Sequence, residues 1–138
     1  LVGSEMCIRD SKWMREAAFS GIVDAQFRIG VANWSGIGGK VDQREAVRWL
    51  CRAAEGGSAK AAAMLAGFLM TGNGLAYSPA RAWALFMRAA KMGNENAAAT
   101  AKILERQLPL QEKRVQRSLL RIKDSKTFLE KLIPRSER

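Results

Sequence analysis

Residues that could carry out acid–base or metal chemistry are scarce in this chain. Its 138 residues include no histidine and two cysteines, Cys7 and Cys51. Without histidine, neither a cysteine–histidine pair nor a histidine-containing metal site can form. The sequence also shows no cluster of metal ligands and no pair of carboxylates placed for a plausible cleft. We therefore expect no enzymatic activity, no metal and no cofactor.

Cys51 falls on one face of an expected helix, among alanine and tryptophan residues. In this setting a cysteine is more typical of a small buried hydrophobic residue than of a reactive thiol, which is the alternative.

Positive charge is the second feature with chemical potential. The formal net charge is +10, and residues 102–138 alone hold 11 basic and 5 acidic side chains. Such a surface could contact the phosphates of nucleic acid or of anionic lipid. No aromatic residue interleaves the charges and no known nucleic-acid-binding motif is present, so a solvated face is favoured. The candidate anion-binding residues are Lys113, Arg114, Arg117 and Arg121, and a second basic stripe is formed by Arg44, Arg48 and Arg52.

Residue types recur with a period of 36, and this period predicts the helices that carry the side chains named above. It relates Ala18, Ala54 and Ala90, and likewise Gly21, Gly57 and Gly93. Small residues at fixed offsets indicate sharp turns or close contacts between backbones, as in stacked supersecondary units. Helix-favouring residues dominate the composition. The pattern predicts an all-α solenoid, an α-α superhelix of helix-turn-helix repeats.

Each period contains two helical patterns. The first helix of the pair is expected at 22–35, 59–71 and 95–106, and the second at 43–55 and 79–91. Their start and stop signals recur in phase. The expected N-cap residues are Asp42, Ser58, Ser78 and Asn94, with Pro79 at a first helical position and Gly57 and Gly93 at left-handed C-terminal positions. The Gly36–Gly39 and Gly72–Gly74 segments are read as turns and not as phosphate-binding loops.

These spaced residues resemble the Sel-1-like repeat, a relative of the tetratricopeptide repeat. The departures are Ala66 for glycine, Leu85 for tryptophan, and Ala101-Lys102 for Leu-Gly. The first full copy carries the pattern at Ala25, Ile29, Gly30, Gly36, Gly38, Asp42, Ala46, Trp49, Ala53, Ala54 and Gly57, and the second at Ala61, Leu65, Gly72, Gly74, Ser78, Ala82, Ala89, Ala90 and Gly93.

The resemblance divides the chain into a half copy at 12–21, full copies at 22–57 and 58–93, and a partial copy at 94–106. Residues 1–11 resemble translated sequencing-adaptor read-through, with a disordered native tail as the alternative. The chain lacks an initiator Met and is expected to be truncated, so no compartment is predicted. Its longest apolar stretch, 61–70, is shorter than the ~20 residues that span a bilayer.

The segment 107–138 breaks the period and carries its own apolar stripe. The spacing predicts one long amphipathic helix, or two helices broken near Asp124-Ser125, that cap the exposed end of the array. The alternative is a helix that pairs with another chain. The stripe consists of Val115, Leu119, Ile122, Leu129 and Ile133.

The resemblance implies a scaffold that binds a protein or peptide in a groove lined by the first helix of each pair. Phe27, Trp34 and Met70 are the expected anchors, although Phe27 and Trp34 could instead pack under the N-terminal half copy. The alternative function is a basic adaptor whose C-terminal helix binds nucleic acid or an anionic membrane surface. The candidate groove residues are Asp24, Phe27, Val31, Trp34, Lys60, Ala63, Gly67, Met70, Asn96, Ala99, Ile103 and Arg106.

Overall fold

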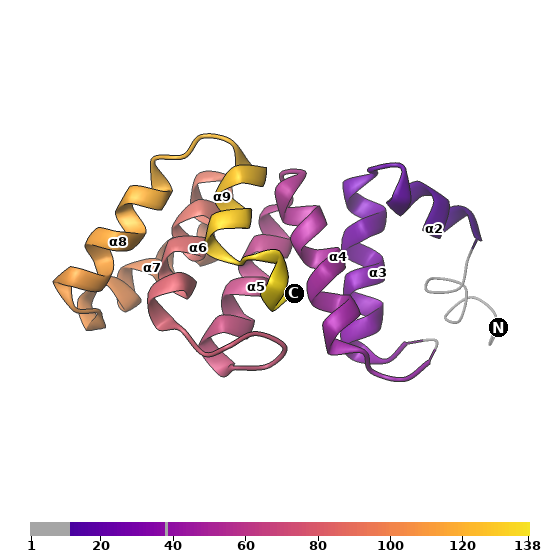
Figure 1. Ribbon diagram of the computed structural model, residues 1–138, viewed down its shortest axis with the longest axis horizontal. Coiled ribbons are helices and arrows are strands. Elements are labelled where there is room, and N and C mark those ends of the chain that lie inside the picture. Colours follow the sequence, from indigo (N-terminus) through magenta and orange to yellow (C-terminus); the bar gives the residue numbers. More distant parts are fainter. Residues whose placement is uncertain (1–11, 38) are drawn as a thin grey trace.

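The computed structural model describes residues 12–37 and 39–138, and over these it contains eight α-helices and no strand (Figure 1). The prediction of an all-α fold is confirmed. The expectations for residues 1–11, including Cys7, and for Gly38 lie outside the described residues. The helices are α2 (Lys12–Phe19), α3 (Val23–Ser35), α4 (Gln43–Glu55), α5 (Ala59–Thr71), α6 (Pro79–Lys91), α7 (Glu95–Gln107), α8 (Leu110–Leu120) and α9 (Ser125–Leu132), followed by the short 3₁₀ helix η1 (Arg135–Glu137).

The helices from α3 to α7 form a stacked array. α3 packs against α4 and α5 packs against α6, while α4 contacts α5 and α6 contacts α7. Successive helices therefore stand beside one another along the long axis of the molecule (Figure 1). This is the arrangement of a helical solenoid, in which each unit buries its apolar face against its neighbours.

All four predicted caps are present, at the starts of α4, α5, α6 and α7. The side chains of Asp42, Ser58 and Asn94 each accept a hydrogen bond at 3.1 Å from the backbone N–H three residues later, and Ser78 does so at 3.3 Å. These bonds satisfy N–H groups that a helix leaves free at its start. The helices end as expected too, because Gly57 has φ +103 and Gly93 has φ +111. Glycine adopts such left-handed backbone without steric cost.

One hydrophobic core runs from α4 through the repeats to α9. Trp83 and Leu65 of the repeats and Phe128 of α9 are fully buried within it. A smaller cluster, centred on Ile29 and Trp49, joins the N-terminal helices. Of the helices that the structure describes, none has the length and apolar character needed to cross a membrane.

The C-terminal segment forms two helices and lies along the side of the array. α8 contacts α6, and α9 turns back to contact α4. The break falls where it was expected, with the Asp124 side chain accepting a hydrogen bond from the Thr127 backbone N–H at 3.0 Å. The expectation of a buried Val115 is wrong, because this side chain is 61% exposed. The chain bends after Leu120, so one stripe cannot face the core along the whole segment.

Candidate functional site

The twelve candidate groove residues lie on α3, α5 and α7, four on each helix. None of them is buried, and Ile103 is the most exposed large hydrophobic residue among them at 60%. The buried residues of these helices, such as Leu65 and Leu104, occupy other positions. Three successive first helices therefore present partly apolar faces that the fold leaves uncovered.

This surface contains three shallow hollows. The largest, 640 Å³, lies between the starts of α3 and α5 and is lined by Asp24, Phe27 and Lys60 among others. Lys60 also lines a 560 Å³ hollow at the start of α7, together with Asn96. Phe27 and Val31 border a third hollow of 240 Å³. The remaining candidates line none of these three hollows, so the residues do not converge on a single deep pocket.

Trp34 is half-buried and contacts the next repeat. Its ring stacks on that of Phe68 in α5, with 3.8 Å between ring centroids and 19° between the planes. Both Trp34 and Phe27 pack against the main core and are absent from the small N-terminal cluster. Trp34 therefore helps to hold α3 against α5 while exposing part of its ring.

Gly67 lies in the middle of α5 beside an open space. A Cβ placed on this glycine would meet no heavy atom within 4 Å. One turn to either side, Ala63 and Met70 are partly exposed. The middle of the surface is therefore a low strip of small side chains, bordered by Met70 at one end.

Charged residues of this surface lie mainly toward the ends of its helices. Arg28 and Asp24 form an exposed ion pair at 3.0 Å on α3. Lys60 and Arg106 are exposed on α5 and α7. The surface therefore combines partly apolar positions with exposed charges.

The candidate anion-binding residues lie on and just after α8. Lys113 donates a hydrogen bond to the backbone carbonyl of Glu105 at 3.1 Å, and Arg117 forms an ion pair with the Glu105 side chain at 3.2 Å. Arg114 and Arg121 are exposed. Lys113 and Arg117, two of the four cations, thus bind Glu105 and join α8 to α7.

Cys51 is buried in the main core. Burial raises the pKa of its thiol to about 12, an effect that the nearby positive charge of Arg138 opposes. At neutral pH the group is a protonated thiol and not a nucleophile. The interpretation of Cys51 as a small buried hydrophobic residue is confirmed.

A basic hollow between α4 and the C-terminal end was not predicted as a site. It is lined by Arg48 and Arg52 of α4 and by Lys126, Arg135 and Arg138 of the C-terminal segment. The sequence did indicate the α4 stripe through the spacing of its arginines. It gave no sign that α9 turns back to complete the hollow.

The chain resembles known repeat proteins in sequence and in fold. Residues 23–58 and 59–94 each match the Sel1 repeat. A protective antigen of uropathogenic Escherichia coli strains that displays an SLR fold is 31% identical, with a TM-score of 0.71, over 91% of this chain and 26% of the antigen. A Sel1 repeat protein from Oxalobacter formigenes is 32% identical, with a TM-score of 0.63, over 67% of this chain and 37% of that protein.

No curated protein matches the sequence. This chain spans only 26% and 37% of the two solved relatives. The two matched repeats, the capped helix pairs and the solenoid architecture agree with one another, and the chain belongs to the Sel1 repeat family.

Proposed function

We propose that this chain is an interaction scaffold that binds an extended or helical peptide of a partner protein across α3, α5 and α7. Sel1 repeat proteins are generally non-catalytic scaffolds for protein interactions. The observation that carries the proposal is the partly apolar surface that α3, α5 and α7 leave uncovered. Exposed apolar surface with a polar rim is typical of protein-binding sites.

The shape of the strip favours a peptide over a small polar metabolite. Peptide grooves take a few large anchors against a shallow apolar floor. Here Phe27 and Trp34 lie on α3, and Met70 lies on α5 with the small residues Ala63 and Gly67. The ion pair at Asp24 and the lysine at position 60 supply polar contacts at the edge.

Gly67→Leu tests the proposed groove without removing any contact of the core. The new side chain would project into open space. Leucine also favours a helix more than glycine, so stability should not fall. Peptides selected from a random library on the unmodified protein provide the probe, and fluorescence anisotropy measures their Kd. We expect the substitution to weaken binding about tenfold or more, the loss that corresponds to one blocked anchor.

Gly67→Ala is the matched control, because it adds helix propensity with little bulk. Peptide binding should survive this change. Selected peptides that bind the Gly67→Leu protein as tightly as the unmodified protein would place the binding surface elsewhere.

Trp34→Ala provides the second test. We expect weaker peptide binding by a domain that remains folded, although the stack on Phe68 predicts a lower melting temperature. Thermal unfolding should therefore be measured beside binding. A domain that fails to fold would assign Trp34 to the core and remove it from the groove.

The alternative function is binding of nucleic acid or an anionic membrane surface by Lys113, Arg114, Arg117 and Arg121. The exposure of Arg114 and Arg121 is the observation in its favour, while the contacts of Glu105 weigh against it. Retention on heparin that falls steeply with salt, and that is lost in an Arg114→Gln/Arg121→Gln protein, would support this alternative.

A further inference from the structure

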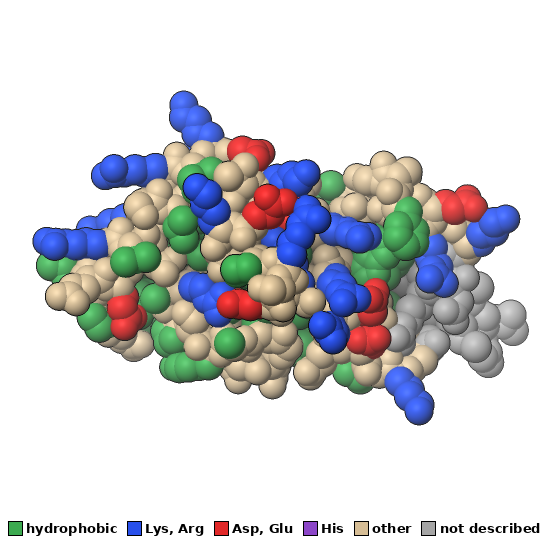
Figure 2. Space-filling model, viewed as in Figure 1, with side chains coloured by type: hydrophobic (Ala, Val, Ile, Leu, Met, Phe, Trp, Pro, Cys, Tyr) green, Lys and Arg blue, Asp and Glu red, His purple; other side chains and the backbone are tan. Residues whose placement is uncertain are grey.

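Five basic side chains surround a hollow of 380 Å³, here called the basic hollow. They come from α4, α9, η1 and the C-terminal residue. In Figure 2, Lys and Arg side chains gather near the middle of the visible face, where α4 and α9 approach one another in Figure 1. The lining residues are Arg48, Arg52, Glu55, Lys126, Arg135 and Arg138.

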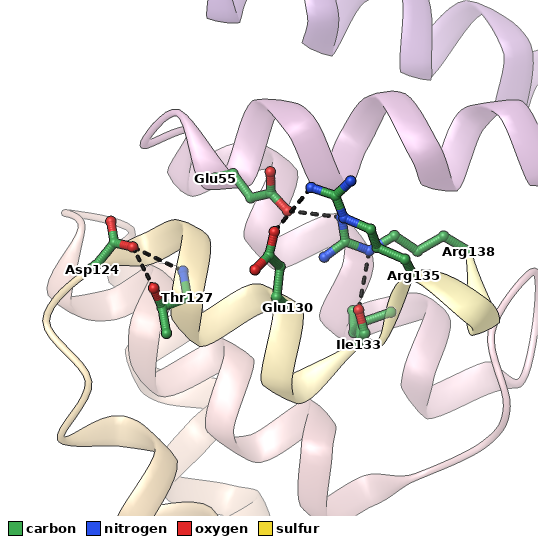
Figure 3. Close-up of polar contacts among 7 residues, drawn as sticks. All are labelled: Glu55, Asp124, Thr127, Glu130, Ile133, Arg135 and Arg138. Atoms are coloured by element: carbon green, nitrogen blue, oxygen red, sulfur yellow. Dashed lines mark hydrogen bonds and ion pairs between the residues drawn. The ribbon is translucent and has the colours of Figure 1, made fainter.

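The fold holds these cations in place by separate means. Arg48 and Arg52 are four residues apart on α4 and so share a helix face. The Arg52 guanidinium also lies 4.7 Å from the centre of the Trp49 ring. Lys126 is carried by the first turn of α9, whose start is fixed by the Asp124 cap (Figure 3).

Arg138 is the most enclosed of the five. Its side chain is 9% exposed and forms an ion pair with Glu55 at 2.7 Å. Its Nε atom donates a hydrogen bond to the Ile133 carbonyl at 3.0 Å (Figure 3). Its Nη2 atom is buried and has no hydrogen-bond partner within the described residues. A buried donor without an acceptor is unfavourable, so an anionic oxygen that reached this atom would stabilise it.

The charges of the basic hollow do not cancel. Three carboxylates pair with three of its cations: Glu45 with Arg48 at 2.9 Å, Glu130 with Arg135 at 2.9 Å, and Glu55 with Arg138. Arg52 and Lys126 form no ion pair in the part of the chain that the structure describes. Asp124 also acts electrostatically on Lys126, so five cations lie beside four carboxylates and a net charge of +1 remains.

We propose that the basic hollow binds one phosphate group. A phosphomonoester carries roughly −1.5 to −2 charges at pH 7, so it is attracted to the remaining positive charge of the hollow. Guanidinium groups bind phosphate oxygens through paired, charge-assisted hydrogen bonds, and lysine adds a compact point charge. The phosphate group belongs either to a free anion or to a phosphorylated side chain. The site is independent of the proposed groove, since its residues lie on α4 and the C-terminal segment.

Titration with inorganic phosphate and with O-phosphoserine, followed by NMR of the backbone amides, tests this site. We expect saturable shifts at α4 and at the start of α9. Lys126→Gln should weaken binding about tenfold, as expected for the loss of one charge-assisted contact. Lys102→Gln is the matched control, because it removes the same charge from an exposed position on α7 outside the hollow. This control should bind both probes as the unmodified protein does.

The two probes separate the sources of the phosphate group. Tighter binding of O-phosphoserine indicates a phosphorylated side chain, and tighter binding of inorganic phosphate indicates a free anion. Binding of O-phosphoserine should weaken from pH 7.5 to pH 5, because the second pKa of a phosphomonoester is about 6. The proposal is overturned if the shifts do not saturate, or if Lys126→Gln and Lys102→Gln weaken binding equally.

Discussion

The repeats and the C-terminal segment are held together by different kinds of interaction. In the repeats, the starts of α4, α5, α6 and α7 are each fixed by a side chain only three residues away, and the same bond returns in successive copies. The C-terminal segment is attached by arginines that reach across long stretches of sequence. Arg81 donates to the carbonyl of Leu132 at 3.1 Å, and Arg138 pairs with Glu55. Repeated local hydrogen bonds fix the helices of the array, whereas long-range arginine contacts hold the C-terminal segment beside it.

Arg88 shows how closely the C-terminal segment is integrated. This buried side chain donates a hydrogen bond to the backbone carbonyl of Ile122, in the bend between α8 and α9. Its guanidinium also lies 4.2 Å from the centre of the Phe128 ring. Burial lowers the pKa of Arg88, while the negative charge of Asp124 raises it. One side chain of α6 thus binds both the bend and the buried aromatic residue of α9.

The largest expected effect is that of Phe128→Ala. Phe128 is fully buried, and removing a buried phenylalanine side chain typically costs about 3–5 kcal/mol in the free energy of unfolding. Urea denaturation followed by tryptophan fluorescence measures this loss. Val115→Ala is the control and should change stability by less than about 0.5 kcal/mol, because Val115 is exposed. An unchanged unfolding midpoint for Phe128→Ala would mean that the segment is not part of the cooperative fold.

Arg88→Met should have the next largest effect. It removes a charge-assisted hydrogen bond and a cation–π contact, which together correspond to roughly 2–3 kcal/mol. Arg114→Met removes an equal charge from an exposed site and should be close to neutral. If Arg88→Met proved as mild as Arg114→Met, the long-range arginine contacts would not be what seats the segment.

Within the repeats, Gly57→Val should cost roughly 1–2 kcal/mol, because an L-residue resists the left-handed backbone at this position. The space around Gly57 is open, so the loss would come from the backbone and not from crowding. Gly93→Val should cost a similar amount, since Gly93 has the same conformation and an equally open setting. Melting temperatures that differ widely between the two variants would contradict the equivalence of the copies.

The smallest effects are expected from the caps. Asp42→Ala and Ser78→Ala should each cost about 1 kcal/mol, the usual value for a lost N-cap. The two losses should add in the double variant, because the caps share no partner. Gln43→Ala, at an exposed position next to Asp42, is the control. Strong non-additivity in urea denaturation would show that the copies are coupled through their caps.

The sequence predicted the repeats better than the C-terminal segment for a physical reason. A cap such as Ser58 depends on residues a few positions away, so type and spacing suffice to find it. The position of α9 on the array depends on where the chain bends. A bend after Leu120 changes the direction of every later side chain relative to α8. The contact between Arg88 and Ile122 follows from that bend, and no periodic pattern encodes it.

The same distinction applies to the candidate sites. The spacing of the first helices placed twelve residues on α3, α5 and α7, and all of them retain exposure. The stack of Trp34 on Phe68 could not be predicted, because it depends on the approach of two helices from successive copies. The sequence indicated one wall of the basic hollow, the stripe of Arg48 and Arg52. The other wall comes from a segment outside the period.

Because Cys51 is buried, the rate at which its thiol is alkylated can report how often the array opens. In the closed protein its pKa is about 12, so an alkylating reagent finds neither access nor a thiolate. Modification must wait until the core around α4 opens, and its rate then reports how often that happens. Because the opened thiol ionises near its ordinary pKa of 9.0, stability conferred by the buried thiol is complete below that pH. This stability is lost progressively as the pH rises toward 12, and alkylation of Cys51 should be faster there.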